Sequence, residues 1–504
     1  MTINSNKQIK LGAIFSYLAI ALNILAGLLY TPWMVQQIGQ SQYGLYTLAN
    51  SLIALFMVDF GLSSAVSRYL SKYRAENNEE KIQSFLGAVY KLYLIIDAII
   101  FAVLIVVFFC IDSIYVKLSP AEIEQFKVVY VISALFAVLN FPFVTLNGIL
   151  NSYEKFVQQK LADIIYRVLV IALTVIALVL GGGLYELVAL HAVAGLVTTL
   201  IKFICVKRYT SARVSLKGID NRIYKEIFSF SVWVTVSSLA QRLVFNITPS
   251  ILGIVSSAAA IAVFGIITTI EGYTYTISGA INGMFLPKIS QIYAKTNDTK
   301  ELTPLLLKVG KFQFALNGLI VVGFATVGKL FIELWMGSEY IDAYYGILLV
   351  IIPGMFANAL QIANTSFVAL NKVKLQAQIN VIMGIINVVL SFIFSYFFGV
   401  IGASLSIFVA YSFRAVAIAI VSYKKLGIDI PTFVRQCYLR MSLPVVLSIV
   451  IGLLLNMVYI GGGWLEFIIK GFTISACYII IMYFVGFGAK ERDALMNIVF
   501  KKIK

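Results

Sequence analysis

Long apolar runs, separated by short polar or glycine-rich breaks, recur along the whole chain. A helix needs about 20 predominantly apolar residues to cross the hydrocarbon core of a bilayer. Runs of this length predict about fourteen membrane-spanning helices, near 12–35, 45–69, 85–110, 126–149, 161–180, 184–206, 228–252, 259–285, 309–332, 342–369, 376–397, 400–423, 440–460 and 464–487. The pattern therefore predicts an all-α polytopic membrane protein.

Composition and charge add an orientation to these helices. Of the 504 residues, 60% are hydrophobic and 12% are charged, whereas soluble domains average about 25% charged. Basic residues, which stay on the cytoplasmic side of short loops, gather at the N-terminus and in every second loop, and the opposite loops hold only Lys117 and Lys127. This predicts that both termini are cytoplasmic. The net charge of +16 follows from topology, and the dispersed basic residues do not form a nucleic-acid-binding stripe.

A basic connection at 207–227 divides the chain into two parts, and a short internal sequence repeat supports this division. The sequence Ile-Phe-Ser-Tyr at 14–17 returns as Ile-Phe-Ser-Phe at 227–230, and transporter folds are often built from repeats that show as weak sequence symmetry. We therefore expect a six-helix N-terminal lobe at 1–206, a cytoplasmic linker at 207–227, a six-helix C-terminal lobe at 228–425, and an appended helix pair with a basic tail at 426–504.

Ionisable side chains within the spans are the strongest functional signal, because each costs about 2.5–3.5 kcal/mol at a helix centre on insertion scales. Arginines there suit bidentate contact with phosphate, and carboxylates suit ion coupling or ion pairing. The arginine candidates are Arg242, Arg414 and Arg68, and the acidic candidates are Asp59, Asp97 and Glu271.

Arg242 lies about fourteen residues into its predicted span, too deep to reach the membrane surface easily. It has two interpretations: a structural ion pair with Glu271 of the next span, or a cavity cation that meets a phosphate. Arg414 lies ten residues before Lys424, and Arg68 lies near the cytoplasmic surface. Both therefore have the alternative of extending toward lipid headgroups.

Other polar residues favour structural roles. His191 is either a helix-packing residue or a proton relay, and Asp163 and Arg167 have the i,i+4 spacing of a surface ion pair. The four cysteines are scattered without CxxC spacing, so we expect no disulfide framework and no metal site. The phosphate-cradling pattern Gly-x-x-x-x-Gly-Lys-Ser/Thr is absent from the chain, so we expect neither ATP hydrolysis nor a cofactor.

Several short motifs carry a family resemblance. They are Gly12–Tyr17, Leu28–Pro32, Ile38-Gly39 with Tyr43–Tyr46, and Asp59–Leu62 followed by Arg68-Tyr69. With these motifs, the chain resembles the bacterial polysaccharide repeat-unit flippases, or O-antigen translocases, of the multidrug/oligosaccharidyl-lipid/polysaccharide exporter superfamily. The motifs lie in the first 75 residues, whereas the expected layout of helices covers the whole chain.

The resemblance implies a two-lobed alternating-access transporter in the cytoplasmic (inner) membrane. Its substrate would be an undecaprenyl-pyrophosphate-linked oligosaccharide, carried from the inner to the outer leaflet before polymerisation into O-antigen, capsule or exopolysaccharide. Similar proteins bind the pyrophosphate with basic residues in a central cavity, and Arg242, Arg414 and Arg68 are the candidates by chemistry and depth. A polysaccharide polymerase and chain-length machinery are the expected partners.

Two other functions remain open. One is a cation-coupled drug antiporter of the same superfamily, which the buried basic residues and the Tyr43–Tyr46 motif disfavour. The other is a membrane-embedded enzyme that uses the same lipid carrier. Such an enzyme is expected to place catalytic carboxylates or arginines in a substantial loop, and the predicted external loops carry almost no charge.

Overall fold

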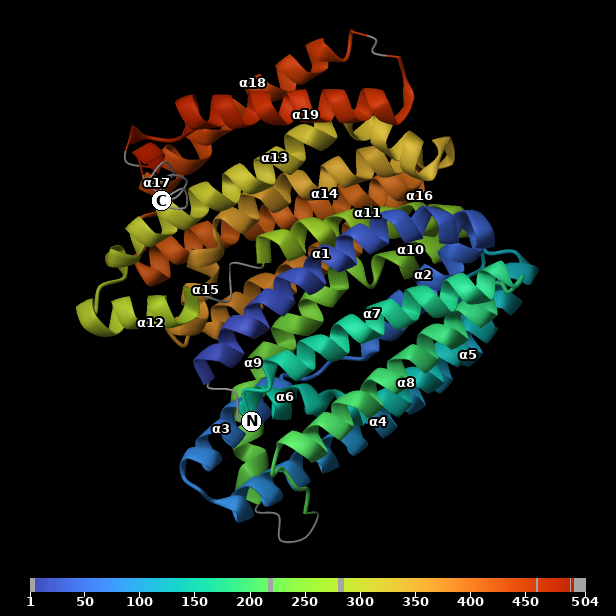
Figure 1. Ribbon diagram of the computed structural model, residues 1–504, viewed down its shortest axis with the longest axis vertical. Helices are drawn as coiled ribbons and strands as arrows, with labels where there is room; N and C mark the ends of the chain where they lie inside the picture. The colour runs from blue at the N-terminus through green and yellow to red at the C-terminus, as the bar shows by residue number, and fades with distance from the viewer. Residues whose placement is uncertain (1–4, 216–220, 280–284, 459–460, 490, 494–504) are drawn as a thin grey trace. The chain divides into compact units, whose positions relative to one another are not determined.

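The computed structural model describes residues 5–215, 221–279, 285–458, 461–489 and 491–493. Within these ranges the chain is helical and contains no β-strand, which confirms the all-α prediction for them (Figure 1). Twelve described segments are long and apolar enough to cross a membrane, so this is a multi-pass membrane protein. Residues 216–220 of the predicted linker and 494–504 of the predicted basic tail lie outside the described residues.

Contacts divide the chain into two compact units, Met1–Gly265 and Ile266–Lys504. In the first unit, α7 packs against α1 and α8, and α5 packs against α2 and α8 (Figure 1). Its elements are α1 (Ser5–Ile38), α2 (Gln40–Phe56), α3 (Leu62–Ala75), α4 (Glu79–Ile114), α5 (Pro120–Asn140), the 3-10 turn η1 (Phe141–Val144), α6 (Thr145–Ser152), α7 (Phe156–Val179), α8 (Leu184–Tyr209), α9 (Asn221–Phe245), α10 (Thr248–Val255) and the start of α11 (Ala258–Gly279).

In the second unit, α14 packs between α13 and α16, and α13 also contacts the C-terminal pair α18 and α19 (Figure 1). After the end of α11, the elements are α12 (Phe285–Thr296), η3 (Thr299–Leu302), α13 (Thr303–Met336), η4 (Ser338–Tyr340), α14 (Ile341–Ala359), α15 (Gln361–Ala369), α16 (Val373–Val421), η5 (Ser422–Leu426), α17 (Ile430–Phe433), η6 (Val434–Leu439), α18 (Arg440–Leu455), α19 (Gly463–Ile481) and η7 (Met482–Gly486).

Side chains are distributed as a bilayer requires. Large apolar residues point outward, such as Phe109, Phe472 and Met457, which are 74%, 77% and 84% exposed. Small polar residues such as Asn387 and Ser391 are fully buried. Lipid tails solvate the apolar exterior as well as a protein core does, so helices associate through small and hydrogen-bonding residues instead. The exposed apolar surface is therefore a membrane surface.

The prediction of one continuous helix over 45–69 is wrong. The structure has α2 and α3 here, separated by residues 57–61, where Phe60 and Gly61 have φ values of 53° and 68°. These left-handed conformations interrupt the helical hydrogen-bond ladder, and they are strained for Phe60 because it carries a side chain. A sequence of mostly apolar residues conceals this break because hydropathy averages over it.

The predicted spans 376–397 and 400–423 meet at a sharp turn within α16. Gly399 has φ 54° and ψ −131°, which no α-helix adopts. Ser406 donates a hydrogen bond to Asn387 (3.2 Å) and Arg414 donates one to Asn380 (3.1 Å), so the two halves run antiparallel. The count of fourteen spans, the cytoplasmic termini and the lobe boundaries at 206, 227 and 425 stay predictions.

Candidate functional site

The break between α2 and α3 organises a polar site within the first unit. Asp59 lies in this break and accepts hydrogen bonds from the backbone N–H of Ser63 (3.3 Å) and from its hydroxyl (3.0 Å). The hydroxyl of Tyr93, on α4, also donates to the Asp59 carboxylate. The carboxylate thus satisfies one of the free N–H groups at the start of α3, as a capping residue does.

Arg242 approaches the other side of the same break from α9. Its guanidinium donates a hydrogen bond to the carbonyl of Ala54, in the last turn of α2, where helix carbonyls lack intrahelical partners. It also attracts Asp59 electrostatically, although the two do not form a direct salt bridge among the described residues. A cation at the C-terminal end of α2 and an anion at the N-terminal end of α3 both have favourable signs for the helix dipoles.

Arg68 and Asp97 belong to helices that flank this break. Arg68 is exposed on α3, and its guanidinium lies 5.9 Å from the centre of the Tyr69 ring. Asp97 is buried on α4, one turn after Tyr93, so both residues lie on the same face of that helix. One carboxylate oxygen of Asp97 has no hydrogen-bond partner in the part of the chain that the structure describes.

Glu271 and Arg414 both lie near Tyr411 in the second unit. Arg414 Nε donates a hydrogen bond to the Asn380 side chain at 3.1 Å. Tyr411, one turn before Arg414, interacts electrostatically with both Glu271 and Arg414. Glu271 therefore has neighbours on α16, whereas Arg242 has neighbours on α2 and α3. Both interpretations of Arg242, the ion pair with Glu271 and the cavity cation, stay predictions.

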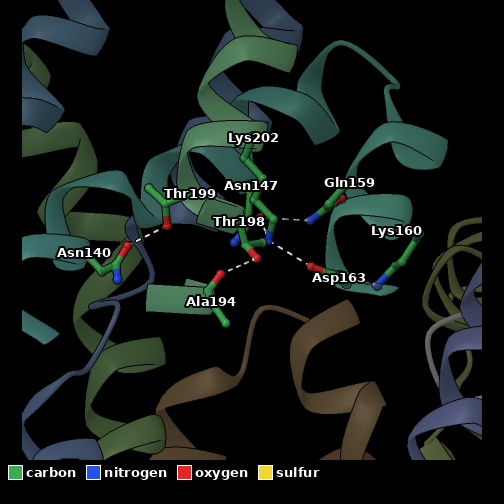
Figure 2. Close-up of polar contacts among 9 residues, drawn as sticks. All are labelled: Asn140, Asn147, Gln159, Lys160, Asp163, Ala194, Thr198, Thr199 and Lys202. Atoms are coloured by element: carbon green, nitrogen blue, oxygen red, sulfur yellow. Dashed lines mark hydrogen bonds and ion pairs between the residues drawn. The ribbon is translucent and has the colours of Figure 1, made fainter. Parts of the chain in front are cut away.

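A polar cluster between α6, α7 and α8 was missed by sequence reasoning (Figure 2). Lys202 of α8 forms an ion pair with Asp163 (2.8 Å) and donates to the Asn147 side chain (3.1 Å). Gln159 also donates to Asn147, at 3.4 Å. A sequence signal existed, because Thr198 precedes Lys202 by one helical turn in a mostly apolar run, which places two polar side chains on one face of α8.

The expected surface pair between Asp163 and Arg167 is wrong. The carboxylate of Asp163 instead pairs with Lys202 and, at 3.6 Å, with Lys160. Spacing along one helix predicts only neighbours on that helix, and here α8 supplies a competing cation. The Lys202 side chain is 16% exposed, so leaving it unpaired would carry a large desolvation penalty.

His191 contributes to helix packing by hydrogen bonding. Its Nδ1 lies 2.8 Å from the Tyr46 hydroxyl, which joins α8 to α2. The other ring nitrogen, Nε2, is buried without a partner among the described residues. The Tyr46 contact is the kind expected of the helix-packing role that the sequence favoured over a proton relay.

Comparison with known proteins decides the family. A family model described as "Polysaccharide biosynthesis protein" matches residues 9–293, which is more than half of the chain. This chain belongs to the polysaccharide biosynthesis protein family. Membership in this family confirms the resemblance inferred from the motifs in the first 75 residues. The matched region contains the α2–α3 break, Arg242 and the polar cluster around Lys202.

Two relatives with related assignments agree with this family. A Shigella flexneri protein assigned as an O-antigen transporter is 24% identical over 382 residues, covering 74% of this chain and 88% of the relative. A Haloferax volcanii protein assigned as a low-salt glycan biosynthesis flippase is 23% identical over 397 residues, covering 76% and 77%. These matches favour a membrane transporter over an enzyme.

The fold of this chain matches the folds of two solved transporters. The inward closed conformation of the lipid II flippase MurJ matches with a TM-score of 0.69 at 16% identity, over 94% of this chain and 98% of that one. An inward-facing multidrug resistance transporter of the MATE family matches with a TM-score of 0.67 at 16% identity, over 84% and 99%. At identities this low, the structural matches establish a shared fold alone.

Proposed function

We propose that this protein flips an undecaprenyl-pyrophosphate-linked oligosaccharide repeat unit from the inner to the outer leaflet of the cytoplasmic membrane by alternating access. The product would enter O-antigen, capsule or exopolysaccharide synthesis, with a polymerase and chain-length machinery as partners. The observation that carries the proposal is the half-buried guanidinium of Arg242 at the α2–α3 break. Broken helices in transporters expose helix termini that bind charged groups of the substrate.

In this proposal Arg242 is the first contact for the pyrophosphate. A guanidinium has five N–H donors in a planar fork, and one of them meets the Ala54 carbonyl in this structure. Phosphate is a stronger acceptor than a carbonyl because its bonds to arginine are charge-assisted and bidentate. The substrate would therefore replace the backbone partner. Arg68 in the first unit and Arg414 in the second are proposed as further phosphate ligands.

The three acidic candidates are proposed to couple transport to an ion or to pair with the arginines. Asp59 is bonded to Tyr93 and Ser63, Asp97 has an oxygen without a partner among the described residues, and Glu271 lies near Tyr411. When phosphate occupies Arg242, Asp59 loses the compensation of that positive charge. A cation or proton at Asp59 would then neutralise its negative charge. Substrate binding at Arg242 and ion binding at Asp59 would in this way be linked.

A deletion strain complemented with variants tests the proposed function. Loss of the protein should cause completed lipid-linked repeat units to accumulate on the cytoplasmic leaflet, measured by extraction and leaflet-specific labelling. Arg242→Ala should give the same accumulation at normal membrane abundance, while Arg435→Ala, which changes an exposed arginine, should transport normally. Full transport by Arg242→Ala would contradict the phosphate role of Arg242.

A second candidate function is a cation-coupled antiporter of small molecules. The fold shared with a multidrug transporter and the acidic groups in the spans favour it. The same deletion strain separates the two functions. Sensitivity to toxic cations with normal glycan would support the antiporter, whereas incomplete glycans on the lipid carrier would indicate an enzyme.

A further inference from the structure

A groove of about 380 Å³ lies between α1 and α7 in the first unit, apart from the α2–α3 break. Polar side chains of Asn23, Lys160, Asp163 and Arg167 line part of it. Asp163 is already engaged by Lys202 at 2.8 Å and by Lys160 at 3.6 Å (Figure 2). The groove lining therefore carries two cations, Lys160 and Arg167, and one carboxylate that is already paired, so its polar part has an excess of positive charge.

Arg167 is the cation of this groove that has a buried donor atom without an acceptor among the described residues. Its Nε is buried and has no hydrogen-bond partner in the described part of the chain, although buried donors are nearly always bonded. Lys160 lies seven residues earlier on α7, which is two helical turns or about 10 Å along the same face. Two long cationic side chains on one face can converge on a single phosphate group.

The remainder of the groove is apolar and opens toward the hydrocarbon. Its lining includes Leu22 of α1 and Val168 of α7, which are 40% and 57% exposed. In a membrane protein, exposed apolar side chains of this kind contact lipid. A ligand that fits both parts needs an anionic head and a long apolar tail.

We propose that the α1–α7 groove binds an anionic phospholipid of the bilayer, with its phosphate on Arg167 and Lys160 and an acyl chain along Leu22 and Val168. A bilayer lipid has direct access to a groove that faces the hydrocarbon, and basic pockets between membrane helices are suited to phosphate headgroups. Binding would join α1 to α7 at a place where their side chains leave space. This site goes beyond the proposed transport function and does not depend on it.

The test measures lipid binding to the purified full chain by native mass spectrometry, with dioleoyl phosphatidylglycerol and dioleoyl phosphatidylcholine as probes. We expect about a tenfold preference for phosphatidylglycerol, as charge-assisted hydrogen bonds provide. The double variant Lys160→Gln/Arg167→Gln should lose this preference. Lys207→Gln/Arg208→Gln makes the same charge change at exposed positions near the end of α8 and should keep it.

Three results would overturn the proposal. They are equal binding of both lipids by the wild-type protein, equal loss in the two double variants, and displacement of phosphatidylglycerol by an equal amount of undecaprenyl phosphate, which would assign the groove to the carrier lipid. If the groove variant does not fold, Lys160→Gln alone provides the comparison, because Lys160 is partly exposed. It should reduce the preference about threefold.

Discussion

At the scale of single residues, charged groups in the first unit are held by backbone ends and by each other. Arg242 meets a free carbonyl at the end of α2, and Asp59 meets a free N–H at the start of α3. Each charge therefore has a structural partner in this structure and also a chemistry suited to transport. Substitution of either residue alone changes both properties, so activity must be compared at equal amounts of folded protein.

The Lys202–Asp163 pair provides a test of residue-scale energetics. Lys202→Met and Asp163→Asn should each lower the free energy of unfolding by about 1–3 kcal/mol. Asp163→Asn leaves the largely buried Lys202 ammonium without its ion pair, and Lys202→Met leaves Asp163 with only the longer contact to Lys160. The double variant should lose less than the sum of the two. Thermal unfolding in detergent measures this coupling, with exposed Lys207→Met as the control. Strictly additive losses would show that the pair contributes nothing of its own.

At the scale of elements, a close approach of backbone limits which residue α2 can carry at Gly44. A Cβ atom at this position would lie 2.0 Å from the carbonyl oxygen of Ala258, at the start of α11. Gly44→Val should therefore separate these segments and destabilise the first unit by about 3 kcal/mol or more, as overpacking does at its upper range. The yield of monodisperse protein and its melting temperature measure the effect.

Gly272 is the matched control for this prediction. It lies in α11, where a Cβ atom would meet no heavy atom of the described residues within 4 Å beyond the backbone of its own helix. Gly272→Ala should leave stability unchanged or raise it slightly, since alanine is the better helix former by about 1 kcal/mol. If Gly44→Val melts at the temperature of Gly272→Ala, the close approach of α2 to Ala258 does not exist in the folded protein.

An ion pair attaches the segment after η7 to α13, and its strength should depend on pH. Glu491 accepts a hydrogen bond from the buried Lys311 side chain at 2.6 Å. Burial raises the pKa of the Glu491 carboxyl, whereas the hydrogen bond and the positive charge of Lys311 lower it. The lowering effects together are larger, so the pKa of Glu491 lies below its ordinary value. The stabilisation is therefore present above the unfolded-state pKa of about 4.3 and disappears as pH falls through the folded-state pKa.

Glu491→Gln should accordingly lower the melting temperature at pH 7, by an amount equivalent to about 1 kcal/mol because the carboxylate is partly exposed. The difference from wild type should shrink as the pH falls below 4. Glu339→Gln, at an exposed glutamate of the same unit, is the control and should have no such pH-dependent effect. A Glu491→Gln deficit that is constant from pH 7 to pH 3 would assign the effect to something other than the ion pair.

At the scale of the whole molecule, the charge pattern makes a prediction about topology. Green fluorescent protein fused to either terminus should fluoresce, because it folds in the cytoplasm, and alkaline phosphatase fused there should be inactive. The two reporters should exchange behaviour when they are inserted at residues 181–183, which connect α7 and α8 and are predicted to be external. Active phosphatase at either terminus would contradict the orientation derived from lysine and arginine.

The sequence by itself determined the class of protein, the approximate position of most spans and the family. Apolar runs of about 20 residues have few alternatives to a membrane helix, because backbone polar groups in hydrocarbon must be bonded within the segment. The turn at Gly399 lies between two predicted spans for the same reason. Depth along a span also identified Arg242 and Asp59 as unusual, because charge in hydrocarbon is costly wherever the helix packs.

Only the tertiary structure decided what those charges contact. The attachment of Arg242 to Ala54 and the replacement of Arg167 by Lys202 as the partner of Asp163 both depend on contacts between different helices. The break at Phe60-Gly61 was likewise visible only in the structure. Hydropathy reports how much a segment prefers lipid to water, and it carries no information about which helix faces become neighbours. A buried ion selects its partner by distance and desolvation across helices, and these are properties of the packed bundle.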